Sequence, residues 1–338
     1  MDINVFWFSI VGLLLSGYAM LDGFDLGVGI VHFTARTDTE RRIFLNSIGP
    51  LWDGNEVWLV TFGGALFAAF PEAYATAFSA FYLPFMALLC ALIFRAVSME
   101  FRSKAAWPWW RTFWDLSFCV SCTACSFLFG VAVGASMMGL PIDVDHEFQG
   151  HLGHFLSFYP CLVGCFVVAL FAMHGTIYLY VKTEGDLQKR LHGLMWKTFG
   201  IFLALYLFTT IYTLIELPHA VKNFRVHSIA WVAVILNILA IANIPRAIYQ
   251  GRPLYAFFSS ACTISALTFL FGAALYPNLM VSSLDPAWSL TIYNAASSVK
   301  TLEFMRIIAF VGMPFVISYT AVVYWLFRGK VKLNATSY

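Results

Sequence analysis

The chain has 338 residues, of which 60% are hydrophobic and only 11% are charged, and its mean hydropathy is +0.77. Soluble domains carry about 25% charged residues, so this composition excludes a water-soluble globular protein and indicates a surface largely covered by lipid. The formal net charge of +2 is small and gives no reason to expect a nucleic-acid partner.

Nine apolar stretches are long enough to cross a hydrocarbon core of ~30 Å, which takes about 20 helical residues. The short alternating runs of a membrane β-barrel are missing. We therefore expect an all-α integral membrane protein with about nine transmembrane helices, forming one polytopic domain over residues 1–338. The expected spans are 4–33, 51–70, 72–98, 113–139, 152–181, 193–216, 226–247, 254–277 and 303–327.

The basic residues predict the orientation of these spans. If the N-terminus lies outside, sixteen of the twenty lysines and arginines fall in or beside segments on the inner side, where such residues accumulate. The other four are Lys222, Arg225, Lys300 and Arg306. The N-terminal run has no basic region before it, so we read it as a retained first span. The prediction is an outer N-terminus and a cytoplasmic C-terminus.

The first span carries two acids within the sequence Leu-Asp-Gly-Phe-Asp-Leu-Gly-Val-Gly. Asp22 and Asp25 are three residues apart, which places both carboxylates on one helix face. Charges inside a span are costly, at roughly 2.5–3.5 kcal/mol each, and are functional candidates for that reason. We favour a proton or ion pathway, and the alternative is a pair of polar groups that help helices to pack.

A second acidic pair begins the next span. Asp53 and Glu56 again share a helix face, and they follow Pro50, which suits a helix start. Capping of the helix N-terminus beside an interfacial tryptophan would explain them equally well. In the predicted orientation, however, both acidic pairs lie in the cytoplasmic half of the membrane, where a proton path from the cytoplasm would begin.

Other polar groups are more simply structural. We expect an ion pair between Arg95 and Glu100 at the inner end of the third span, and another within Lys300, Glu303 and Arg306. His174 lies in mid-span and is expected to bond to a neighbouring helix rather than to bind haem or metal.

Seven cysteines all lie in apolar runs, and none suggests a disulfide framework. Cys119, Cys122 and Cys125 repeat every three residues, which favours helix contacts over a metal site. The outer segment 143–154 holds His146, His151 and His154 with three acids, but their spacing matches no closed metal site. We read it as a solvated loop and predict no metal.

The chain also lacks the motifs of a self-sufficient enzyme. It has no nucleotide-binding glycine pattern, no Cys-x-x-Cys-His haem attachment and no His-Glu-x-x-His site. Paired histidines within the membrane, which an intrinsic redox centre would need, are also missing. The sequence therefore predicts a subunit of a larger complex.

Several longer motifs resemble subunit II of the cytochrome bd-type quinol oxidases, a family of bacterial terminal oxidases. The first hundred residues are densest in these motifs, and the remainder matches by span pattern and short stretches. The matching segments are GYAMLDGFDLGVG (17–29), TERRIFLNSIGPLWDGNEVWL (39–59), GGALFAAFPEAYATAFSAFYLPF (63–85), RAVSMEFRSK (95–104), HGTIYLY (174–180) and NAASSVKTLEFM (294–305).

The resemblance implies two four-helix bundles plus a peripheral helix in a bacterial inner-membrane protein. It implies a partner, subunit I, with three haems and the quinol site, and it allows a small single-span third subunit. It also implies that this chain binds no haem through its own ligands, although a structural quinone or lipid can be present. The complex would oxidise quinol and reduce dioxygen to water, forming a proton gradient without pumping.

By position, the resemblance assigns Asp22, Asp25 and Asp53 to a proton route and Trp58 and Arg95 to an oxygen route. The assignment is weaker for Glu56, since relatives also carry Gln there. The sequence also allows two other functions: a proton-coupled secondary transporter that uses the same acids, and a scaffold that only holds subunit I. The quinone type and the oxygen affinity are not determined by the sequence.

Overall fold

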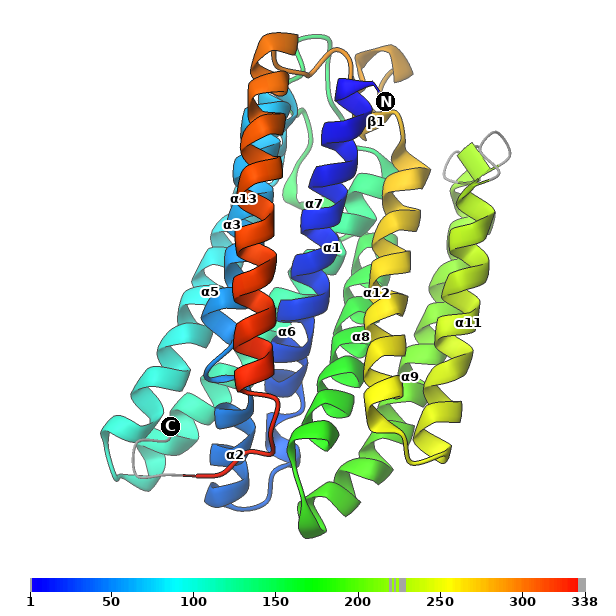
Figure 1. Ribbon diagram of the computed structural model, residues 1–338. Helices are drawn as coiled ribbons and strands as arrows, with labels where there is room; N and C mark the ends of the chain where they lie inside the picture. The colour runs from blue at the N-terminus through cyan, green and yellow to red at the C-terminus, as the bar shows by residue number, and fades with distance from the viewer. Residues whose placement is uncertain (1, 219–220, 222, 225–228, 334–338) are drawn as a thin grey trace.

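The computed structural model describes residues 2–218, 221, 223–224 and 229–333, and most of these residues are helical (Figure 1). Lys222 and Arg225, two of the basic residues left out of the orientation count, lie outside the described residues. The helices are α1 (Ile3–Ile30), α2 (Asp38–Ile48), α3 (Trp52–Ala69), α4 (Pro71–Ala80), α5 (Tyr82–Phe101), α6 (Pro108–Met138), α7 (Leu152–Phe155), α8 (Phe158–Lys182), α9 (Gly185–Glu216), α11 (Ile229–Tyr249), α12 (Pro253–Leu275) and α13 (Val299–Leu326), with short 3₁₀ helices η1 (His32–Thr34), η2 (Arg102–Lys104) and η3 (Pro286–Trp288).

Each of the nine expected stretches contains a helix, so the all-helical membrane fold is confirmed. Within the described residues, eight helices are long and apolar enough to cross a membrane. The exception among the expected spans is α3, whose 18 residues begin with the polar sequence Trp-Asp-Gly-Asn-Glu. The acids that mark α3 as a candidate site therefore also interrupt its apolar character.

The third expected span differs from the prediction because it is divided into α4 and α5. The break falls at Phe81, between the end of α4 at Ala80 and the start of α5 at Tyr82. Pro84 explains it, since in a continuous helix its ring would meet the carbonyl group of Ala80 four residues earlier. As a result α3 forms its hairpin contact with α4, whereas α5 packs mainly against α6.

The long helices form two neighbouring groups. α1, α3, α5 and α6 make up the first, and α8, α9, α11 and α12 make up the second, with α1 and α6 packed directly on α8 (Figure 1). α8 is the most enclosed of the eight candidate spans, and α13 lies at the edge beside α1 and α3 with its apolar side chains exposed. This arrangement agrees with two four-helix bundles and one peripheral helix.

Glycines let α1 and α8 pack so closely that their backbones are in contact. A Cβ atom on Gly27 would lie 1.9 Å from the carbonyl oxygen of Phe171, and one on Gly175 would lie 2.4 Å from the carbonyl carbon of Gly27. Only a residue without a side chain fits such a contact. The glycines of the first acidic motif therefore fix α1 against the centre of the second bundle.

Two short segments close the ends of the molecule. Near the N-terminus, β1 (Asn278–Met280) pairs antiparallel with β2 (Leu290–Thr291) in the polar segment before α13. At the opposite end, the N-terminus of α2 is capped by side chains: Thr37 accepts a hydrogen bond from the Glu40 N–H, and Glu40 accepts one from the Arg36 N–H. α2 was not expected from the sequence, because most of its side chains are polar and it lacks the apolar run that marks a span.

The C-terminal end of α13 is held by hydrogen bonds rather than by buried side chains. The ammonium group of Lys182 donates to the carbonyl oxygen of Phe327, and Lys330 donates to that of Thr183 over 2.7 Å. The Val331 N–H donates to the Lys182 carbonyl oxygen over 3.0 Å. The chain after α13 is thus fastened to the end of α8.

Candidate functional site

A buried ion cluster joins α1 to α5 inside the first bundle. Arg95 makes a bidentate pair with Asp22, in which its two terminal nitrogens donate to the carboxylate oxygens over 2.8 and 2.5 Å. The same guanidinium lies 4.0 Å from the carboxylate of Asp25. All three side chains are fully buried. The three-residue spacing of the acids thus turns both toward one cation, as their shared helix face predicts.

This partnership corrects the expected pairing of Arg95 with Glu100. The carboxylate that receives the guanidinium fork is Asp22, 73 residues earlier in the chain. A fully buried cation needs a fully buried counter-charge, and Glu100 is exposed at the end of α5. Of the other expected pairs, Arg306 and Glu303 do form an ion pair over 2.5 Å at the start of α13.

Two polar side chains extend the cluster toward the peripheral helix. Asn55 of α3 is buried, and its amide donates to Asp25 over 2.7 Å and to the Leu21 carbonyl oxygen over 3.2 Å. The Tyr324 hydroxyl of α13 donates to the Asn55 side-chain oxygen over 2.9 Å. Asn55 lies within the second acidic motif but was not singled out, and no local pattern marks Tyr324.

The acids of α3 lie at the margin of this cluster. Asp53 is exposed in the first turn of α3, and Glu56 is half-buried. Trp58 packs on α1 at Gly17, where a Cβ atom would come within 2.5 Å of the indole ring. The guanidinium of Arg95 lies 6.0 Å from the ring centroid of Trp52. The structure therefore brings Asp22, Asp25 and Arg95 into one buried group and leaves Asp53 outside it.

The charges of the buried group suit a single exchangeable proton. Two carboxylates face one guanidinium, so the group has a charge of −1 when both acids are ionised and is neutral when one is protonated. Within the described part of the chain, the Asp25 Oδ1 atom has no hydrogen-bond partner. A buried oxygen in that state is costly. A proton could bind to this Asp25 oxygen without displacing an existing hydrogen bond.

A second charged cluster lies where α1, α2, α5 and α6 meet, at the end of the bundle opposite the N-terminus (Figure 1). Asp115, at the start of α6, is fully buried and accepts hydrogen bonds from Arg102 over 2.6 Å and from Arg41 over 3.1 Å. Its Oδ1 atom also lies 2.7 Å from Nε2 of His32. Arg102 bonds in addition to Asp38 over 2.7 Å. Sequence reasoning missed Asp115, because a single acid near a span end resembles an ordinary interfacial residue.

His32 should make the protein sensitive to acid. Burial lowers the pKa of His32 below its usual value of about 6.5, although the neighbouring Asp115 acts to raise it. The unfolded chain therefore binds more protons as the pH falls below about 6.5, and the folded state loses stability over that range. We expect His32→Gln, whose amide can still donate to Asp115, to reduce the fall in Tm of the purified complex between about pH 7.5 and 5.5. An equal fall in the variant and the wild type would contradict this prediction.

His174 and Cys122 are both held by contacts between helices. His174 is fully buried, with Nδ1 2.7 Å from the Ser260 hydroxyl and Nε2 3.1 Å from the Met20 carbonyl oxygen, which confirms the expected helix contact. Cys122 packs against Gly29 at the α1–α6 contact. These two groups act as helix contacts in the described structure.

The histidine loop of residues 143–154 does not assemble a metal site in the described structure. His146 lies 3.7 Å from a carboxylate oxygen of Glu72, His151 accepts the Gly153 N–H, and His154 contacts the Gly139 carbonyl oxygen. Among the residues described, no group of three histidine, cysteine or acidic side chains is arranged to hold a metal ion. Burial lowers the pKa of His154 below its usual value.

Comparisons with known proteins identify one family. A family model described as cytochrome bd terminal oxidase subunit II matches residues 3–327. Cytochrome bd-I ubiquinol oxidase subunit 2 of Escherichia coli (strain K12) is 33% identical over 96% of this chain and 94% of its own length. Cytochrome bd ubiquinol oxidase subunit 2 of Bacillus subtilis (strain 168) is 34% identical over 96% of both chains. A chain of the bd oxidase structure from Geobacillus thermodenitrificans superposes with a TM-score of 0.80 over 97% of this chain and 99% of its own, at 17% identity, and supports the fold.

Proposed function

Because this chain belongs to the cytochrome bd terminal oxidase subunit II family, we propose that it is the non-haem subunit of a bacterial quinol oxidase. Its partner would be a haem-bearing subunit I, whose haems would pass electrons from quinol to dioxygen. The two relatives are named as subunit 2 of a ubiquinol oxidase, and these names support the proposal. Membership of an oxidase family favours this function over that of a secondary transporter.

The proposed orientation has the N-terminus outside and the C-terminus in the cytoplasm. The clusters of arginine and lysine around α2, the start of α6 and the end of α13 support it, since they gather at the end of the bundle opposite the N-terminus (Figure 1). Cytoplasmic segments carry such an excess. In this orientation Asp22 and Asp25 lie in the inner half of α1, about 12 and 8 Å from its end at Ile30 by helical rise.

Within the complex, the chain would deliver protons from the cytoplasm toward the partner. The observation that carries this proposal is the buried Asp25 carboxylate, with one oxygen bonded to Asn55 and the other without a partner among the described residues. Exposed Asp53 would collect protons at the first turn of α3, and half-buried Glu56 lies one turn further along the same helix. Both carboxylate oxygens of Asp22 are bonded to Arg95, so Asp25 is the group that we propose gains and loses the proton.

Two further roles are proposed on the basis of the family resemblance. Trp58 would line an oxygen route, supported by its position against α1 at Gly17. Arg95 was assigned to the same route, but its pairing with Asp22 gives it a more direct part in the proton cluster. A structural quinone and a small third subunit have no residue in the described structure that identifies their place.

Replacing Asp25 by Asn tests the proton role. Asn keeps the size and the hydrogen bond to Asn55 but cannot release a proton, so we expect quinol oxidase turnover to fall at least about tenfold in assembled, haem-replete complex. Asp53→Asn should slow turnover less, because water can reach half-buried Glu56, the next acid along α3, without passing Asp53. The matched control is Asp186→Asn, which should keep full turnover. The Asp186 side chain is 93% exposed and lies at the same end of the bundle as Asp53.

Haem content separates the proton role from a scaffolding role. Wild-type turnover in haem-replete Asp25→Asn complex would refute the proton role. Loss of haem from the purified variant, with normal turnover per remaining haem, would instead favour a subunit that only supports subunit I. Measuring turnover per haem, together with the haem-to-protein ratio, distinguishes the two.

A further inference from the structure

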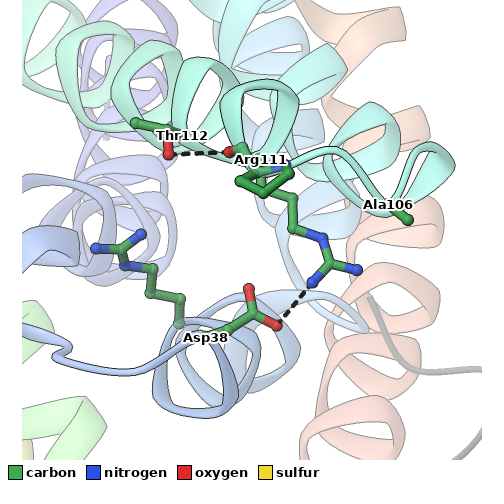
Figure 2. Close-up of a pocket in the computed structure, with 6 residues that line it drawn as sticks. Asp38, Ala106, Arg111 and Thr112 are labelled. Carbon is green, nitrogen blue, oxygen red and sulfur yellow. Dashed lines mark hydrogen bonds and ion pairs between the residues drawn. The ribbon is translucent and has the colours of Figure 1, made fainter.

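A pocket of about 230 Å³ opens at the inner end of the first bundle, where α2 meets the start of α6 (Figure 2). Figure 2 shows the side chains of Asp38 and Arg111 turned toward each other across it, with Thr112 beside them. The pocket lies at the N-termini of both helices, which carry partial positive charge. Its lining residues are Asp38, Arg41, Ala106, Pro108, Arg111 and Thr112.

The charges around this pocket leave a positive excess. Arg41 and Arg111 line it, and Arg102 lies just behind, bonded to Asp38 and Asp115. These three guanidiniums face two carboxylates, so one positive charge is uncompensated while His32 is neutral. The Nη1 atom of Arg111 lies 3.3 Å from a carboxylate oxygen of Asp38, a long distance for an ion pair, and 39% of the Arg111 side chain is exposed. The Nε atoms of Arg41 and Arg111 are buried and have no hydrogen-bond partner among the described residues.

An apolar stripe on α6 begins beside the pocket. Trp109, Phe113, Leu116 and Val120 follow one another at spacings of four, three and four residues, and all are exposed. Trp107 stacks on Trp109 with ring centroids 5.8 Å apart. Exposed tryptophans mark the level of lipid headgroups, and an apolar helix face beyond them lies against acyl chains. The stripe therefore continues from the pocket into the membrane.

We propose that this pocket binds the phosphate group of an anionic phospholipid, with one acyl chain lying along the α6 stripe. The arginine pair supplies the charge-assisted hydrogen bonds that a phosphate needs. The carboxylate of Asp38 faces the same space and disfavours a second negative charge. This arrangement suits a phosphodiester of charge −1. A basic pocket between membrane helices on the cytoplasmic side is a recognised form of lipid-headgroup site.

Lipid titration of the purified, delipidated complex tests the proposal. Native mass spectrometry would count bound molecules of phosphatidylglycerol, phosphatidylcholine and inorganic phosphate. We expect the wild type to retain phosphatidylglycerol in preference to phosphatidylcholine, and Arg111→Gln to bind phosphatidylglycerol about five- to tenfold more weakly. Arg246→Gln, the same change at an exposed site at the end of α11, should bind it like the wild type.

A second variant separates lipid from a free anion. Phe113→Ala should weaken phosphatidylglycerol binding while leaving inorganic phosphate binding unchanged, because it alters only the acyl-chain contact. Equal phosphatidylglycerol binding by the wild type, Arg111→Gln and Arg246→Gln would overturn the proposal. Binding of inorganic phosphate without any preference for phosphatidylglycerol would also overturn it, in favour of a free-anion site. Neither result depends on oxidase turnover, so the lipid site and the proton role can fail separately.

Discussion

Arg95→Met is expected to prevent accumulation of the assembled complex. The substitution leaves the carboxylates of Asp22 and Asp25 fully buried, without the cation that now faces both. Removing one partner of a buried ion pair costs about 3–5 kcal/mol, and the total stability of a protein is only about 5–15 kcal/mol. The measurement is the yield of haem-replete complex from membranes, together with the Tm of any complex that can be purified.

A second substitution should reverse much of this loss. In Arg95→Met combined with Asp22→Asn, one of the two uncompensated charges is removed, so we expect a higher yield than in Arg95→Met alone. The difference between the double and single variants measures the coupling between the two residues. Wild-type yield and Tm in Arg95→Met would mean that the ion cluster does not stabilise the fold. No recovery in the double variant would mean that Arg95 acts through contacts other than Asp22.

Gly27→Ala is expected to have the second-largest effect, through packing rather than charge. The new Cβ atom would lie 1.9 Å from the Phe171 carbonyl oxygen and 2.8 Å from the Gly175 nitrogen. Both atoms are backbone, so no side-chain rotation can relieve the clash and α1 must move away from α8. Overpacking of this kind costs about 1–3 kcal/mol, and we expect a lower Tm and a lower yield of complex.

Gly12→Ala is the matched control in the same helix. A Cβ atom there has nothing within 4 Å. Alanine also favours a helix over glycine by up to about 1 kcal/mol. The control should therefore equal or exceed the wild type in Tm, and the difference between the two variants isolates the α1–α8 contact. If Gly27→Ala and Gly12→Ala melted together, the close approach of the helices would not be contributing to stability.

The two expected outcomes have a common origin in one short motif of α1, which carries both the glycines and the acids. The glycine face of α1 fixes that helix against α8, and its acidic face then meets Arg95 of α5 and Asn55 of α3. Asn55 in turn contacts Tyr324 of the peripheral helix. A single short motif thus organises the contacts of α1 with its neighbours, which accounts for the density of small and acidic residues within it.

The class of protein, the approximate positions of the apolar helices and the acids that merit attention could all be predicted from the sequence. Composition and apolar run length are properties of single segments, and a membrane penalises a charge wherever it lies along a span. Asp22 and Asp25 could therefore be chosen without knowing their neighbours. The motifs around them also sufficed to identify the family, which the comparisons confirm.

Which of these groups meet depends on how the helices pack in three dimensions. Arg95 pairs with Asp22, 73 residues away, although Glu100 is closer in sequence, and Asp115 collects His32, Arg41 and Arg102 from separate segments. Such pairings depend on how helices distant in the chain turn toward one another, which hydropathy and spacing do not encode. For the same reason Asn55 and Tyr324 join the candidate proton site while Asp53 remains at its margin, because burial is a property of the packed bundle and not of the segment.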